Sequence, residues 1–230
     1  MKKNAMKETN MKNNTKHMTK KEDENLKSQG VKILPWVGGA YEEGIQGKKV
    51  MVLGYSLYGN KPEDSAPDAL RVRVDLYCNG EFEPWMNTYT KSFRALFGDP
   101  TIIREDCRDL FEKIVFYNYV QEPLTGARVD PTDEQLLASI VPFKAFLEEY
   151  LPDVIITWGK SLFQVLPGFE DDFKGHKGTS IEGADVWIYN IGGHEITVLE
   201  MTHPSAAFSY EYWSEVIRKL LSRPMNQPEN

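Results

Sequence analysis

The stretch Val50-Met51-Val52-Leu53, closed by Gly54, decides the fold class of this chain. A short, unbroken apolar run of this kind is typical of a strand that is buried on both faces of a parallel sheet. Two further runs, at residues 114–120 and 153–157, also read as strands. Helical patterns separate the three, so the order of elements predicts an α/β fold with three α/β/α layers around a mostly parallel central sheet.

The remaining segments fit the same alternation. Expected helices cover residues 88–97, 102–111, 130–150, 160–166 and 210–221. The longest is expected to begin at Asp130-Pro131, a capping carboxylate followed by a proline at the first helical position. Two short apolar runs around Gly192-Gly193, at 186–189 and 196–199, predict a hairpin. Residues 54–68 read as a long loop rich in Gly, Pro, Asn, Asp and Ser, and such loops are usually functional or disordered.

Length and charge suggest how the chain is organised. A chain of 230 residues fits one large or two small domains, and we expect a single domain over residues 31–224. Residues 1–30 hold eight lysines and four acidic residues, a net +4, which leaves −11 for the rest of a chain whose total is −7. That basic segment has almost no large apolar residue besides methionine, so we expect a disordered tail. A second short tail is expected at 225–230.

Several classes of protein are disfavoured by composition. No run of eighteen apolar residues is present, so no membrane span is expected, and the N-terminus lacks the apolar region of a secretory signal. Cys78 and Cys107 have no metal-type spacing, and the four histidines are dispersed, so we expect neither a metal site nor another cofactor. Free thiols are typical of a reducing compartment, which predicts a cytoplasmic protein.

Two polar side chains stand where ligands are held in open α/β sheets. His203, in Met201-Thr202-His203-Pro204-Ser205, follows an expected strand and precedes the expected C-terminal helix. Asn118 stands near the end of the 114–120 strand. Ligands bind outside the carboxyl ends of strands in such sheets, so we expect His203 and Asn118 to face one cavity.

Three segments, taken together, resemble the uracil-DNA glycosylase superfamily. The most specific covers residues 114–166. It includes Tyr117-Asn118-Tyr119-Val120, Pro142-Phe143-Lys144-Ala145-Phe146-Leu147 and Pro152-Asp153-Val154-Ile155-Ile156-Thr157-Trp158-Gly159-Lys160, and it is similar to the middle of the thermophilic-type enzymes. The second is His203-Pro204-Ser205 followed by a helix with Trp213. The third, Val52-Leu53-Gly54-Tyr55-Ser56-Leu57-Tyr58-Gly59, occupies the place of the family's first motif.

The resemblance implies a uracil-DNA glycosylase-like fold and hydrolysis of the N-glycosidic bond of uracil or a damaged base in DNA, without a cofactor. Asn118 would read the edge of a base taken out of the stack. His203 would stabilise the charge on the departing base, and Ser205 would support the loop or contact a flanking phosphate. The loop with Gly54, Tyr55 and Tyr58 would hold sugar and water. Tyr58 is the best-placed stacking aromatic, with Tyr77 and Phe82 as alternatives.

The first motif departs from the family pattern. Neither an acid nor an asparagine stands within it, and Ser56 occupies the catalytic position, where a hydroxyl is a poor base. Asp64, or its neighbours Glu63 and Asp68, would have to fold back to replace the missing group. The cysteines that bind the cluster of the thermophilic-type members are also missing. The alternative is therefore a catalytically altered or inactive relative that binds a base, a nucleotide or a partner protein in the same pocket.

The negative charge of residues 31–230 affects which partners the chain can bind. Duplex DNA is bound through phosphate contacts with lysine and arginine, and a body of net charge −11 repels its backbone. A single strand, a flipped base or a nucleotide-like small molecule is the partner that the sequence predicts. A basic arm that contacts nucleic acid is the alternative reading of residues 1–30. The sequence leaves the oligomeric state open.

Overall fold

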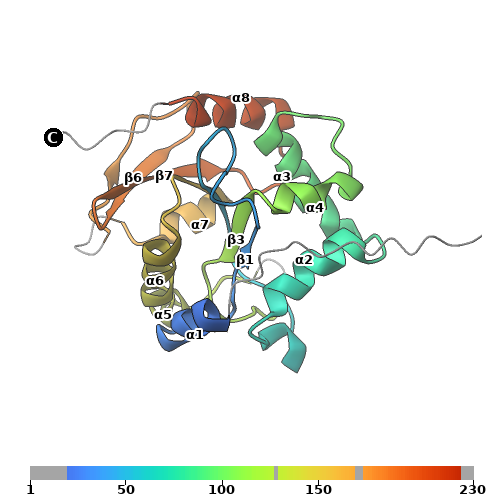
Figure 1. Ribbon diagram of the computed structural model, residues 1–230, viewed down its shortest axis with the longest axis vertical. Helices are drawn as coiled ribbons and strands as arrows, with labels where there is room; N and C mark the ends of the chain where they lie inside the picture. The colour runs from blue at the N-terminus through green and yellow to red at the C-terminus, as the bar shows by residue number, and fades with distance from the viewer. Residues whose placement is uncertain (1–19, 127–128, 169–172, 224–230) are drawn as a thin grey trace, which may run out of the picture.

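Seven strands pair into one mixed, mostly parallel sheet in the computed structural model, which describes residues 20–126, 129–168 and 173–223 (Figure 1). In the order in which they pair, the strands are β1 (Trp36–Val37), β3 (Ile114–Asn118), β2 (Val50–Gly54), β4 (Val154–Trp158), β7 (His194–Met201), β6 (Val186–Ile191) and β5 (His176–Lys177). Strands β3, β2, β4 and β7 run parallel, whereas β1 and the β5–β6 pair add antiparallel edges. The expected α/β class is confirmed at this level.

Helices cover both faces of the sheet. They are α1 (Lys20–Ser28), α2 (Ala69–Asn79), α3 (Asn87–Phe97), α4 (Cys107–Phe111), α5 (Asp133–Ala138), α6 (Ile140–Tyr150), α7 (Lys160–Val165) and α8 (Tyr210–Leu221), with 3-10 turns η1 (Pro62–Ser65), η2 (Pro84–Met86) and η3 (Arg104–Asp106). Figure 1 shows α3, α4 and α8 on one side of the sheet and α1, α5 and α6 on the other.

The alternation of side chains along each strand supplies two cores. In β2, Val50 and Val52 pack with helices α2, α3, α4 and α8, whereas Met51 and Leu53 pack with α1, α6 and α7. Every residue of β2, β3 and β4 is buried. Successive side chains of a strand point to opposite faces, so a continuous apolar run is what a sheet covered on both faces requires.

The connections bring four strand ends to one place. The chain leaves β2 through α2, α3 and α4 to reach β3 on one side of it, and then crosses through α5 and α6 to β4 on the other side. Gly54 pairs with Asn118 at the carboxyl ends of β2 and β3, and Trp158 pairs with Met201 at those of β4 and β7. In open α/β sheets, this reversal of direction leaves a crevice at the carboxyl edge.

The expectation of a disordered tail over residues 1–30 was wrong for residues 20–28. Residues 20–28 form α1, and its Leu26 is fully buried in the core. Arg71 of α2 donates two hydrogen bonds to Asp23, of 2.9 and 2.7 Å, and a third to the Pro35 carbonyl. These contacts fix α1 to α2, because a bidentate arginine–carboxylate pair is directional as well as charged. Residues 1–19 and the expected tail at 225–230 lie outside the described residues.

The expected helix over 130–150 is two helices. The first helix begins two residues later than expected and is capped by Thr132, whose hydroxyl accepts from the Gln135 backbone while the Gln135 side chain accepts from the Thr132 backbone. The break falls between α5 and α6, at Ser139. Pro142 explains it, because a proline lacks the N–H that would bond to the Ala138 carbonyl and its ring collides with that carbonyl.

Two other segments differ from the expectation. The 102–111 helix is a 3-10 turn followed by the short α4. Helix α2 was not predicted at all, although Leu70, Val74 and Tyr77 have helical spacing and are all buried. The omission matters, because α2 supplies one wall of the site.

Candidate functional site

A cavity of about 310 Å³ lies at the carboxyl edge of the sheet. Its lining comes from the loop after β2, from the ends of β3 and β4, from the loop after β7, and from α2, η2 and α3. The lining residues are Gly54, Tyr55, Ser56, Leu57, Tyr58, Arg73, Trp85, Thr88, Tyr89, Phe116, Asn118, Trp158 and His203. Cavities of roughly 300 Å³ and above are the size that binds small molecules.

Two buried polar atoms in this lining lack a hydrogen-bond partner. The Asn118 side-chain Nδ2 and the Ser56 Oγ are both inaccessible, and neither has a partner within the described part of the chain. Asn118 is only 3% exposed. A buried donor left unpaired costs about 1–3 kcal/mol, so native proteins keep few such groups. Two residues of the lining therefore carry unused hydrogen-bonding capacity.

Gly54 permits Asn118 to stand where it does. A Cβ built on Gly54 would overlap the Oδ1 of Asn118, so any larger residue would push the amide away. The two loops beyond these residues run together, with the Tyr119 N–H donating to the Gly54 carbonyl at 3.0 Å and the Val120 N–H to the Tyr55 carbonyl at 2.9 Å. A glycine is thus required at position 54 because the Asn118 side chain lies so close, and not because the backbone there has an unusual angle.

The backbone of Asn118 is held from behind by a second buried amide. The Gln121 Nε2 donates to the Asn118 carbonyl at 2.7 Å. Its Oε1 accepts from the Lys32 and Ile33 N–H groups, each at 3.1 Å. The Gln121 side chain therefore links the segment after α1 to the end of β3, where Asn118 stands. Gln121 gave no signal in the sequence, because its role depends on two backbone groups nearly ninety residues away as well as on the nearby Asn118 carbonyl.

His203 is arranged as a neutral hydrogen-bond donor. Its Nδ1 accepts from the Ser205 N–H at 3.2 Å and lies 2.7 Å from the Ser205 Oγ. An amide N–H can only donate, so Nδ1 must be unprotonated and the ring proton of the neutral form sits on Nε2. Burial lowers the pKa of His203, which favours the uncharged ring. Gly159, which precedes α7, has a φ of +112° that disfavours other residues, and a Cβ there would be in ordinary contact with the His203 Cβ at 3.6 Å.

Aromatic rings form most of the remaining wall. Trp158 lies 5.1 Å from both Tyr89 and Phe116, centroid to centroid, and 6.0 Å from the His203 ring. The Trp158 Nε1 donates to the buried Ser92 hydroxyl at 2.9 Å, which fixes the indole. Such a lining offers flat apolar contact to a planar ring. The sequence could have indicated Phe116 as a lining residue, since it precedes Asn118 by two residues and therefore lies on the same face of the strand.

Arg73 supplies the full positive charge among the described residues of the lining. Its Nη2 donates to the Asp64 carboxylate at 2.9 Å and to the Tyr58 carbonyl at 3.3 Å. Burial raises the pKa of Tyr89, and the charge of Arg73 opposes that rise, which indicates that the two groups interact. No feature of the sequence had singled out Arg73.

The structure brings together most of the expected site residues, but not all of them. Gly54, Tyr55, Ser56, Tyr58, Asn118 and His203 line the cavity. Ser205 lies behind His203 and sets its tautomer instead of lining the cavity. Asp64 also stands outside the lining, with its carboxylate paired to Arg73, so it does not fold back into the first-motif position.

The aromatic residues named for stacking are distributed differently. Tyr58 lines the cavity but is 42% exposed. Tyr77 is fully buried and bonded to Cys107 and Thr90 instead, and Phe82 is 60% exposed and outside the lining. Trp85, Tyr89, Phe116 and Trp158 take the place that the sequence gave to Tyr77 or Phe82.

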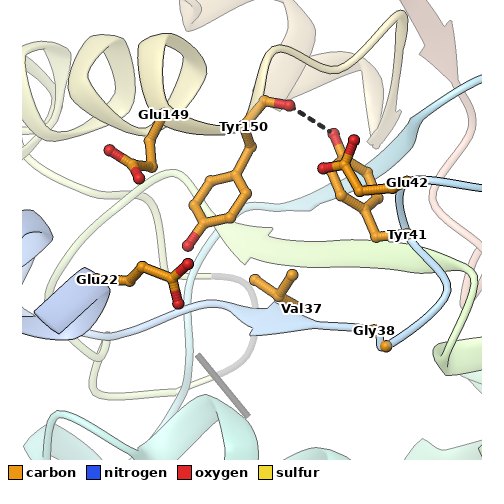
Figure 2. Close-up of a pocket in the computed structure, with 8 residues that line it drawn as sticks. Glu22, Val37, Gly38, Tyr41, Glu42, Glu149 and Tyr150 are labelled. Carbon is orange, nitrogen blue, oxygen red and sulfur yellow. Dashed lines mark hydrogen bonds between the residues drawn. The ribbon is translucent and has the colours of Figure 1, made fainter. Parts of the chain in front are cut away.

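A second, smaller cavity of about 120 Å³ lies between α1, β1 and the end of α6 (Figure 2). Three carboxylates surround it, those of Glu22, Glu42 and Glu149. The Tyr41 hydroxyl donates to the Tyr150 carbonyl at 3.2 Å, as the dashed line in Figure 2 shows. An acidic lining disfavours nucleotides and other anions, and no residue of the expected site takes part.

Over 20–126, 129–168 and 173–223, no group of three or more histidine, cysteine or acidic side chains is placed to hold a metal ion. Within the same ranges, no helix combines the length and apolarity that crossing a membrane requires. Cys78 and Cys107 are both free thiols.

No protein-family model matches the chain, and no curated protein sequence matches it significantly.

Proposed function

We propose that this chain binds a planar nucleobase, uracil or a close relative, in the cavity at the carboxyl edge of the sheet. The observation that carries the proposal is the unpartnered Nδ2 of Asn118, a lining residue that is only 3% exposed, together with the unpartnered Oγ of Ser56 in the same lining. The edge of a pyrimidine presents carbonyl oxygens and an N–H in one plane, and an amide side chain can both donate to and accept from that edge.

The shape and chemistry of the lining support the same ligand. Aromatic rings stabilise a base by stacking whatever its sequence context. The Nε2–H of His203 would add a donor for a ring oxygen. The acidity of the chain, −7 overall, favours a small nucleotide or a single strand over a long duplex.

Hydrolysis of an N-glycosidic bond is the second candidate, and the neutral His203 favours it. In that reaction the bond between C1′ and the base nitrogen breaks with its electron pair leaving on the base. Water adds its hydroxyl to C1′, and its proton ends on the base. A neutral Nε2–H would stabilise the negative charge on the departing ring oxygen, a contribution of about 3–4 kcal/mol for one such donor. The lining residues include no carboxylate to activate the water, so base binding is the stronger candidate.

Calorimetric titration with uracil tests the binding proposal. Asn118→Asp should weaken uracil binding by about tenfold or more, because a carboxylate keeps the size of the amide but removes both of its donors. Asn79→Asp is the matched control, since Asn79 ends α2 at an exposed position outside the lining. Ser56→Ala serves as a second variant in case a buried charge at 118 prevents folding. Equal uracil affinity for the parent, Asn118→Asp and Ser56→Ala would overturn the proposal.

Base release from oligonucleotides tests the hydrolytic candidate. Single- and double-stranded substrates with uracil or hypoxanthine should release free base, and His203→Ala should slow the release by about 10²- to 10³-fold. Absence of release by a protein that still binds uracil would eliminate hydrolysis and leave binding as the function.

A further inference from the structure

Arg73 reaches the cavity with most of its donors unused. A guanidinium carries five N–H groups, on Nε, Nη1 and Nη2. In Arg73 only Nη2 is engaged, by Asp64 and by the Tyr58 carbonyl. The Nε and Nη1 groups have no hydrogen-bond partner among the residues that the structure describes. Three N–H groups of the guanidinium, one on Nε and two on Nη1, are therefore free to donate to phosphate oxygens.

The engaged side of Arg73 is held firmly. The Asp64 carboxylate, only 12% exposed, also accepts from the Lys61 N–H at 3.1 Å. Gly59 makes room for it: a Cβ there would overlap Asp64 Oδ2, and the φ of +150° disfavours other residues as well. A side chain that is fixed before the ligand arrives loses less conformational entropy on binding.

We propose that Arg73 binds the phosphate group of a nucleotide whose base lies in the cavity. The inference rests on the proposed function and adds a ligand class to it: a base that carries a phosphate, not a free base. Arg73 belongs to the same lining as Asn118, and the base and phosphate sites are therefore parts of one cavity. The phosphate belongs either to a nucleoside monophosphate or to a short single strand, since both present the same oxygens.

Calorimetry with a matched set of ligands tests the inference on the full chain. The probes are uridine, uridine 5′-monophosphate and a single-stranded trinucleotide with a central uridine. The parent should bind the monophosphate or the trinucleotide about tenfold more tightly than uridine, a factor equivalent to about 1.4 kcal/mol. That ratio should shrink as salt concentration rises, because the added contact is between charges. The ligand with the larger ratio identifies the source of the phosphate.

Variants separate Arg73 from a general charge effect. Arg73→Gln should reduce the affinity ratio to about one, and Arg73→Lys should give an intermediate ratio, because lysine keeps the charge but loses the planar, fixed array of donors. Arg108→Gln is the matched control: Arg108 is equally exposed and paired to Asp75, but lies outside the lining. Its ratio should equal that of the parent.

The outcomes distinguish the two proposals. Uridine binding with no gain from a phosphate, or a gain that survives in Arg73→Gln, overturns the role of Arg73 and leaves base binding intact. Failure of all three probes and of uracil overturns both proposals.

Discussion

Replacing Asn118 by alanine should leave the fold as stable as before or make it more stable. The Nδ2 atom is buried without a partner, and such a donor costs about 1–3 kcal/mol. Truncation also removes packing of the side-chain carbon, worth about 0.8 kcal/mol. The space that is left joins an existing cavity, so no new enclosed void forms. The two effects together predict a free energy of unfolding between about equal to that of the parent and about 2 kcal/mol higher.

Gln121 is the matched control, because it is another buried amide only three residues away. Its side chain makes three hydrogen bonds, to the Asn118 carbonyl and from the Lys32 and Ile33 N–H groups. At about 1 kcal/mol each, with buried backbone groups left unpaired, their loss in Gln121→Ala should lower the free energy of unfolding by about 3 kcal/mol. The two substitutions should therefore change the free energy of unfolding in opposite directions, or their effects on it should at least differ by several kcal/mol.

Urea denaturation followed by far-ultraviolet circular dichroism measures both variants on one scale. This signal avoids the fluorescence of Trp85 and Trp158, which line the altered cavity. If Asn118→Ala is destabilised as much as Gln121→Ala, the amide of Asn118 is a bonded structural group, and the argument for a ligand at that position is refuted.

Four further predictions concern other parts of the structure. Gly54→Ala should overpack against Asn118, and should therefore lower the free energy of unfolding by about 1–3 kcal/mol and weaken uracil binding. An unchanged affinity for uracil would contradict the close approach of Gly54 to the Asn118 amide. The pKa of His203 is lowered by burial, so a nuclear magnetic resonance titration should find its midpoint below about 6.5. The unfolded chain then binds the proton more readily, and stability due to His203 should fall as the pH drops below about 6.5 towards the native pKa; His203→Gln should lack this fall. Burial raises the pKa of the Cys107 thiol to about 11, so a disulfide reagent at neutral pH should label it rapidly only after denaturation. Leu26→Ala should cost about 2–5 kcal/mol in urea denaturation, and a cost below about 0.5 kcal/mol would mean that α1 is not packed as described.

The parts of the fold that sequence predicted best are those where burial dictates composition. The runs at 50–53, 114–120 and 153–157 became β2, β3 and β4 because a strand covered on both faces must be apolar at every position. The C-terminal helix over 210–221 has the expected bounds, since one buried stripe and a capping Ser209 define it. Helix α1 was missed because its burial rests on one leucine and on the ion pair between Asp23 and Arg71, which no local pattern reveals.

The site was predicted as far as it depends on strand ends. Asn118 and His203 follow strands whose carboxyl ends must share an edge, so their convergence follows from topology. Arg73, Trp85 and Tyr89 come from helices whose position over that edge depends on tertiary packing. The placement of Asp64 failed for a related reason: the sequence supplies several acids in the 54–68 loop, but not the arginine of α2 that binds one of them.

Both borders of the sheet end in very short strands, β1 with two residues and β5 with two. A free strand edge can template the addition of another chain, and its capacity grows with the number of unpaired peptide groups in line. Two residues give an incoming strand almost nothing to pair with, so the extended, pairing-prone strands stay in the interior. Concentrated samples should accordingly resist edge-to-edge aggregation, and fibril formation would first require β1 or β5 to peel away and uncover the longer strand beneath.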